Sequence, residues 1–383
     1  MQSHSAHRRL SALAALFLSA CGTSEASEDP KNGDTIDGAD AADGAADGAD
    51  AADGADATDG TPDDLAAPPP PGAEAPPDGP PVTFAIRKIY FGDTNPDGTP
   101  NPQSGWTKFG YDLDGVASTP TDALPCKPRN NATPKNVHTD GESGRDNGFG
   151  KNILPILLGL QSDFSSKFNE QQNSGERNLL IDFAALGTAP NYGPLTTRLM
   201  VGQAAGETLP TWTGTDVFDA LPSSVVDGQV TEPRISSAEG YLTDDVLVSR
   251  FPGEFTITLF MAGFKVDLTI SGVTFTAQLD TARTSATSGV IAGVLPIDEF
   301  TASVRKVIGA ADPSFCDPTS PTLESIISQI EQSADSLVDG SRDAARTCDA
   351  ISFGIGFEAS LVALGKVAEE QNPSVDPCDE LNQ

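Results

Sequence analysis

Oxygen-bearing side chains occupy alternate positions near residue 95. Asp93, Asn95 and Asp97 precede Gly98 in the stretch GDTNPDGTPN, residues 92–101. Carboxylate and amide oxygens are the ligands that calcium prefers, and a glycine permits the sharp turn that brings alternate side chains to one ion. The same residue types also favour an ordinary turn, because Asp and Asn side chains hydrogen-bond to their own backbone. The sequence is therefore consistent with a calcium loop and with a plain polar turn.

This pattern resembles the first six positions of the EF-hand calcium loop. The resemblance ends there, because Ser104 stands where that loop needs a bidentate glutamate, and the prolines at 96, 100 and 102 preclude flanking helices. The stretch is more similar to the helix-free calcium loops of secreted repeat proteins, whose remaining ligands come from elsewhere in the chain. The acids that could supply those ligands are Asp112 and Asp114, or Asp140, Glu142 and Asp146.

Few residues in the sequence are candidates for catalysis. His138 is the only histidine beyond the first twenty residues, and it lies in a polar loop where we expect an exposed side chain. A Ser-His-Asp mechanism would depend on this one imidazole, and no G-x-S-x-G motif accompanies it. A hydrolase that uses a pair of carboxylates needs no histidine. The many acidic residues leave this possibility open without indicating a particular pair.

The first twenty residues have the features of an export signal. Arg8 and Arg9 precede an apolar run, residues 10–18, that is too short to span a bilayer. The run ends in Leu-Ser-Ala-Cys at residues 18–21, which resembles the lipobox of bacterial lipoproteins. This resemblance implies that the Cys21 thiol receives a diacylglyceryl group, that the signal is cleaved, and that the new amino terminus is acylated with a fatty acid such as palmitate. An anchor with three acyl chains holds a protein on a membrane durably.

A low-complexity segment follows Cys21. Residues 34–64 repeat Asp, Gly and Ala, and residues 68–81 are rich in proline, so that residues 21–81 are predicted to form a disordered, acidic tether. Of the net charge of −32, residues 22–81 carry −15 and the signal carries +2, which leaves −19 for residues 82–383. Such acidity disfavours nucleic acid and anionic lipid headgroups as direct partners and is compatible with divalent cations.

The elements that must position the polar residues are predicted to be mainly strands. Residues 83–91, 178–186 and 196–202 are expected to be strands. In residues 254–280 the alternation of apolar residues resets at 262–263 and at 271–272, which predicts a three-stranded antiparallel meander. Helices are predicted at 153–168, 298–309 and 321–340. Residues 349–370 fit both periodicities, and the helix is preferred. Residues 92–150 are expected to be irregular.

Four cysteines remain after Cys21, and an even number in an exported chain predicts two disulfides. The spacing allows three pairings. A helix at 349–370 that runs antiparallel to the preceding helix would bring Cys316 near Cys378 and leave Cys126 for Cys348. The predicted fold is α+β: one domain over residues 82–383 with an antiparallel sheet or sandwich, helices packed near its carboxy-terminal end, and two disulfide links.

These features predict a lipoprotein of the cell envelope, anchored through Cys21 at the outer membrane or cell surface. Its domain is expected to serve in binding or structure, not catalysis, with calcium as a candidate cofactor held by Asp93, Asn95, Asp97, Asp112 and Asp114. One alternative is a carboxylate-pair hydrolase that acts on envelope or extracellular polysaccharide. A second alternative is a lipid carrier in which the meander curves around an acyl chain.

Overall fold

The structure is a computed structural model that describes residues 66–72, 75–206, 208–261, 264–311, 313–317, 319–369 and 378. The predicted signal, Cys21 and most of the predicted tether lie outside these residues. Within them the protein is mostly β-structure, with few helices. No helix of the described part is long and apolar enough to cross a membrane.

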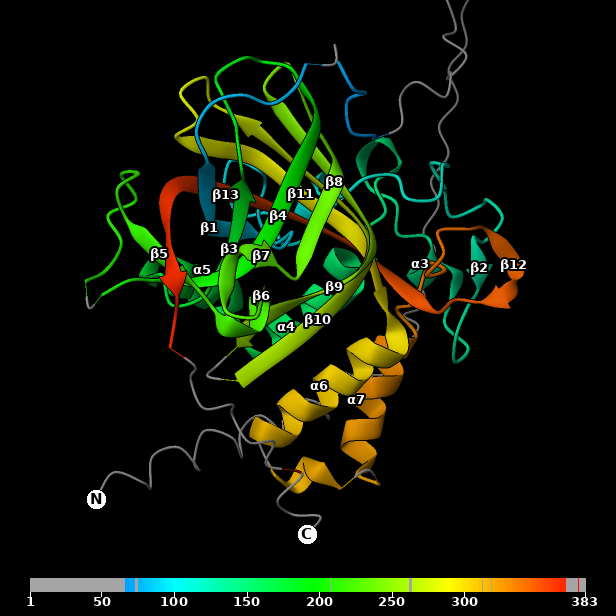
Figure 1. Ribbon diagram of the computed structural model, residues 1–383. Coiled ribbons are helices and arrows are strands. Elements are labelled where there is room, and N and C mark those ends of the chain that lie inside the picture. The colour runs from blue at the N-terminus through cyan, green and yellow to red at the C-terminus, as the bar shows by residue number, and fades with distance from the viewer. Residues whose placement is uncertain are drawn as a thin grey trace, which may run out of the picture. The chain divides into compact units, whose positions relative to one another are not determined.

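Eight strands pair antiparallel in an unbroken ring, so that the sheet closes on itself (Figure 1). In ring order they are β1 (Val82–Tyr90), β3 (Asn178–Phe183), β4 (Tyr192–Ala204), β8 (Ile235–Thr243), β9 (Val246–Met261), β10 (Phe264–Leu279), β11 (Ser285–Pro296) and β13 (Ala350–Val367), and β13 pairs again with β1. Closure leaves no free edge along the paired part of the ring, and exposed edges are where sheets aggregate.

A ninth strand, β5 (Val217–Ala220), bridges two members of the ring. It pairs antiparallel with β4 and parallel with β13. As a result, β1, β3 and β4 are buried on both faces: Phe84 and Ile181 belong to the main core, whereas Ala85, Leu180 and Met200 join Phe218 of β5 in a second, smaller core. Alternate residues of a strand point to opposite faces, which explains this division.

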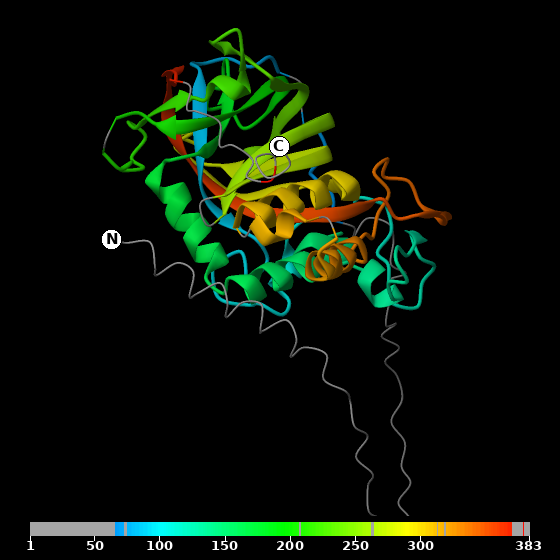
Figure 2. The same ribbon diagram turned by 90° about the horizontal axis from the view of Figure 1, so that it is seen from below.

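The helices are α3 (Pro134–Val137), α4 (Leu154–Leu160), α5 (Phe164–Ser174), α6 (Ile297–Ala311) and α7 (Pro321–Glu331). Two of the helices, α5 and α6, pack directly on the closed sheet. Helix α5 packs on β1, and α6 packs on β10 and on α7, which lies beside it (Figures 1 and 2). Phe164 and Phe168 of α5 and Phe300 of α6 extend the main core.

Four short strands, in two pairs, complete the described structure. β2 (Cys126–Lys127) pairs parallel with β12 (Asp343–Thr347), and β6 (Val225–Val226) pairs with β7 (Gln229–Pro233). The stretch 92–150 otherwise contains only turns and helices of at most five residues, as its composition predicts. Its position beside β13 is therefore set by side-chain and covalent contacts together with the short β2–β12 pairing.

The prediction of an α+β fold matches this architecture in part. The antiparallel sheet and the two disulfides are confirmed, and helices α6 and α7 occur where helices are predicted. The helix expected at 349–370 is wrong, because these residues form β13, the longest strand. Ile351, Phe353, Ile355 and Phe357 alternate into the main core, and pairing on both sides with β1 and β11 outweighs the helical spacing.

The meander expected at 254–280 is a hairpin of two strands. β9 and β10 pair from Phe264–Met261 at the turn to Gln278–Val246 at the base. The second reset, at Ser271-Gly272, is a bulge inside β10, where the register shifts and Gly272 takes a φ of +62°. A bulge inserts one residue and moves the apolar face by one position, as a turn would.

Candidate functional site

Four aspartates of the irregular stretch lie near one another and are called the acidic cluster here: Asp112, Asp114, Asp140 and Asp146. Asp112, Asp114 and Asp146 each offer a carboxylate oxygen, and these oxygens lie within 4.8 Å of one another. The backbone of Asp140 pairs with that of Asp146 in an isolated antiparallel bridge. The structure thus brings Asp112 and Asp114 to the second group of acids that the sequence offers as possible ligands.

Backbone amides hold the carboxylates of the acidic cluster in place. Asp146 is 9% exposed, and its Oδ2 accepts a hydrogen bond of 2.7 Å from the Leu113 amide. Asp112 Oδ1 accepts from Gly115 and Val116, and Asp140 accepts from the Ser118 amide. The carboxylates therefore point toward one another because the loop that carries Asp112 and Asp114 folds over the segment that carries Asp140 and Asp146.

Burial and mutual repulsion favour the protonated form of these acids. Burial raises the pKa of Asp140 to about 7, and the negative charges of Asp114, Asp335 and Asp112 act in the same direction. The pKa of Asp146 is raised well above its usual value, first by burial and then by Asp114 and Asp140. Burial also raises the pKa of Asp114, against the attraction of Arg342.

One arginine balances part of this charge. Arg342 donates from Nη1 to Asp114 Oδ2 at 2.8 Å, and it also contacts Ser118 Oγ and the Ala123 carbonyl. The side chain of Asp114 is 10% exposed, so this ion pair is largely removed from water. Arg342 comes from the loop before β12, more than two hundred residues from Asp114, and no local sequence pattern predicts that they meet.

The stretch with alternating oxygens forms a closed turn of its own. Asp97 Oδ1 accepts from the amide and the hydroxyl of Thr99 at 2.9 and 2.6 Å, which lowers the pKa of Asp97. The Asn95 side chain bonds with Thr99 and Asn101. Neither Asp93 nor Asp97 joins a group of three potential metal ligands among the described residues. The predicted five-residue calcium set is therefore split between this turn and the acidic cluster.

Asn147, directly after Asp146, fastens the stretch to the sheet. Its buried amide donates to the carbonyls of Trp106, Phe109 and Gly354 and accepts from the amides of Gly150 and Gly354. Gly354 belongs to β13, and a Cβ there would lie 2.7 Å from the backbone of the facing loop. The glycine thus permits the close approach that lets one side chain satisfy so many backbone groups.

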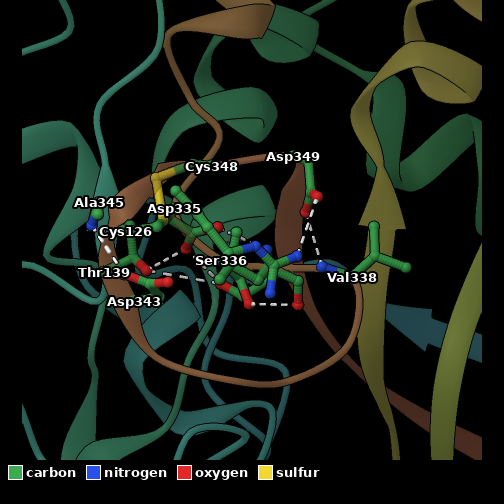
Figure 3. The surroundings of a disulfide bond; sticks show 12 residues. Cys126, Thr139, Asp335, Ser336, Val338, Asp343, Ala345, Cys348 and Asp349 are labelled. Carbon is green, nitrogen blue, oxygen red and sulfur yellow. Dashed lines mark hydrogen bonds and ion pairs between the residues drawn. A yellow bond between two sulfur atoms is a disulfide. The ribbon is translucent and has the colours of Figure 1, made fainter.

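A second buried network lies on the other side of Asn147. Asp335 accepts hydrogen bonds from the Ser352 amide, the Ser352 hydroxyl and the Thr139 hydroxyl, and the Ser352 hydroxyl accepts from the Gly148 amide. Figure 3 shows Asp335 and Thr139 near the Cys126–Cys348 bond. Full burial raises the pKa of Asp335 to about 6 despite these donors. The network joins the chain after α7, the start of β13 and the segment with Asp140. Sequence reasoning does not identify Asp335, because its partners are distant in the chain.

The disulfides pair as predicted. Cys126 bonds to Cys348 and Cys316 bonds to Cys378, with Sγ–Sγ distances of 2.02 and 2.03 Å. The Cys126–Cys348 bond joins the irregular stretch, residues 92–150, to the chain just before β13, and Cys348 is followed by Asp349 (Figure 3). An open hollow of about 520 Å³ adjoins this bond and is lined mainly by polar residues, including Lys127, Arg129 and Thr347.

His138 is buried, which corrects the expectation of an exposed residue. Its side chain is 5% exposed, and its Nδ1 has no hydrogen-bond partner. Burial lowers the pKa of His138, and the positive charge of Lys151 lowers it further. Lys151 donates to the His138 carbonyl and lies over the ring of Trp106. Within the part of the chain that the structure describes, no hydrogen bond joins this buried imidazole to a nucleophilic side chain.

The comparisons with known proteins gave no match to a family model, to a curated protein or to a solved structure.

Proposed function

We propose that this protein is a lipoprotein of the cell envelope whose domain serves a binding or structural role. The observation that carries this proposal is the order of three features: a cysteine directly after an apolar signal, a long acidic segment, and a domain with two disulfides. The disulfides support export, because thiols stay reduced in most cytosolic proteins. The anchor itself is inferred from the lipobox resemblance.

The anchor is tested on the full-length chain expressed in a bacterial host. Mass spectrometry of the amino-terminal peptide should show Cys21 as the first residue, carrying a diacylglyceryl group and an amide-linked acyl chain. The Cys21→Ser variant should lose these masses and leave the membrane fraction. An unmodified protein in the medium, cleaved elsewhere, would overturn the proposal.

The filled interior supports a role other than lipid carriage. Among the described residues, a cavity of about 30 Å³ lies between the closed sheet and the helices beside it, lined mainly by apolar side chains such as Ile86, Phe149 and Phe353. Pockets that hold small ligands usually measure about 300 to 1,000 Å³. Phe275 and Phe357 fill much of the remaining space, with ring centroids 4.7 Å apart. The absence of lipid that copurifies with the protein would agree with this role.

Calcium at the acidic cluster stays a prediction. Three carboxylates close together suit a hard cation that takes six to eight oxygens, although buried acids also persist without an ion by remaining protonated. Calorimetric titration of calcium into the protein tests it, with Asp146→Asn expected to abolish the heat and Asp97→Asn expected to leave it unchanged. No binding at millimolar calcium would remove calcium from the proposal without affecting the anchor.

One observation favours the carboxylate-pair hydrolase as a second candidate. Asp140, with a pKa raised to about 7, would hold a proton near neutral pH, as the general acid of a glycosidase must. Activity on a panel of polysaccharides that is lost in Asp140→Asn but kept in Asp97→Asn would establish this function. Inactivity of the wild-type protein on the whole panel would exclude it for those substrates.

A further inference from the structure

The proline-rich residues before β1 lie on the domain. The strap, as it is called here, consists of the described residues 66–72 and 75–81, which the composition assigns to the tether. In Figure 1 the blue segment before β1 passes over the upper end of the closed sheet. Each of its hydrogen-bond partners belongs to a loop or strand end of the domain. The boundary between tether and domain, predicted at residue 82, therefore has ordered contacts on its amino-terminal side.

The first contact of the strap is also its most buried one. Ala66 is 7% exposed. Its amide donates to the Ser143 carbonyl at 2.8 Å, and its carbonyl accepts from the Asp112 amide at 2.9 Å. Ser143 and Asp112 lie on the two segments that carry the acidic cluster. Ala66 therefore links these segments through its backbone, at the residue where the described chain begins.

The remaining contacts of the strap are single hydrogen bonds along the end of the sheet. Tyr241 Oη donates to the Pro69 carbonyl at 2.6 Å, and the Gly193 amide donates to the Ala75 carbonyl at 2.9 Å. The Leu186 amide donates to the Pro80 carbonyl at 3.0 Å, and Tyr192 donates to the side chain of Asp78. Most strap residues are exposed or half-buried, so few apolar contacts reinforce these bonds.

We propose that the strap is a latch that detaches locally while the closed sheet stays folded. Segments with few buried apolar groups and exposed hydrogen bonds open at lower cost than the core. Proline keeps the detached chain extended, which reduces the entropy lost on docking. When the strap is docked, Ala66 links the two segments that carry the acidic cluster. When the strap is detached, these segments lose the two hydrogen bonds to Ala66.

Detachment would also lengthen the tether, a consequence that depends on the proposed anchoring. Residues 66–81 in an extended polyproline conformation would span about 50 Å, at roughly 3.1 Å per residue. The domain would then reach farther from its membrane when the strap is detached than when it is docked. The docked form would keep the acidic cluster close to the point where the tether leaves the domain.

Amide hydrogen exchange on the full chain carrying Cys21→Ser tests the latch without the anchor. The amides of Ala66, Asp112, Leu186 and Gly193 report the strap, and that of Leu180 in β3 reports the core. These four amides, called the strap amides here, should exchange at least about a hundredfold faster than the Leu180 amide, at neutral pH and without denaturant. Equal rates, rising only as the whole protein unfolds, would overturn the proposal.

Conservative variants sharpen the test. Tyr241→Phe and Tyr192→Phe each remove one strap hydrogen bond and should accelerate exchange of the strap amides about fivefold, which is the effect of losing one ordinary hydrogen bond. Exchange at Leu180 should not change. Tyr111→Phe is the matched control, because the Tyr111 hydroxyl bonds with Thr276. Acceleration by the control alone, or of all amides together, would contradict a separate latch.

Discussion

The buried carboxyl group of Asp335 should make the protein less stable as the pH rises from 4 to 7. Its pKa is about 6 in the folded protein, against 3.8 for an ordinary aspartate, because it is fully buried. Folding therefore takes up a proton between these values. The stabilisation that the protonated Asp335 gives the folded protein is complete below pH 4 and is lost as the pH rises through 6. Above pH 7 the contribution of Asp335 to stability changes little.

The size of this effect follows from the two pKa values. The pKa of Asp335 differs by about two between the folded and the unfolded protein, which corresponds to about 3 kcal/mol of unfolding free energy. Asp335→Asn removes the titration and keeps the shape of the side chain. Its amide can still accept from the Ser352 backbone, and it can donate to the hydroxyl groups that now donate to Asp335.

Urea unfolding at several pH values, at constant ionic strength and with EDTA, measures the difference. The unfolding free energy of the wild-type protein should fall by about 3 kcal/mol more than that of Asp335→Asn between pH 4 and pH 7.5. The other buried acids titrate in both proteins and largely cancel. Asp163→Asn, at an exposed position, is the control. Parallel curves for the wild type and Asp335→Asn would refute the reasoning.

Three further changes have effects that the structure defines. Replacing Cys126 and Cys348 by alanine opens a link between residues 222 positions apart and should cost about 5 kcal/mol in urea unfolding, by the loop-closure entropy. Gly354→Ala forces a methyl group against backbone 2.7 Å away and should lower the unfolding free energy by roughly 3 kcal/mol. Arg342→Met leaves the buried Asp114 without its ion-pair partner and should cost about 2 kcal/mol at pH 8. The cost should fall as the pH is lowered, because burial raises the pKa of Asp114 and so favours its protonated form.

Local patterns predict several strands of the closed sheet, and the failures occur where distant contacts decide. Residues 83–91 and 178–186 are rich in residues that favour strands, and they contain β1 and β3. In β13 the spacing of Phe357, Leu361 and Leu364 also suits a helix, but neighbours on both sides complete its hydrogen bonds only as a strand. Gly354 and Gly356 within it also weaken a helix and allow Phe109 to approach.

The disulfide pairing is correct although its sequence argument depends on a helix at 349–370, where the structure has β13. Cys348 precedes β13, and the pairing with Cys126 depends on how the irregular stretch lies against that strand. Sequence reasoning does not identify Arg342 or Asp335 as parts of the candidate site, because Arg342 contacts Asp114 and Asp335 contacts Thr139 across about two hundred residues of sequence. The expectation of an exposed His138 fails because its neighbours in sequence are polar, whereas the folded chain buries it.

Protons and calcium would compete for the same oxygens of the acidic cluster, which gives the calcium prediction a sharper test. Asp140, with a pKa of about 7, holds a proton at pH 5, and the raised pKa of Asp146 acts in the same direction, so that a bound cation must compete with protons. Calcium affinity should therefore rise at least about tenfold between pH 5 and pH 8. Calorimetry in two buffers of different ionisation enthalpy should detect protons released on binding. An affinity that does not change with pH, or that survives Asp146→Asn, would show that any bound calcium lies elsewhere.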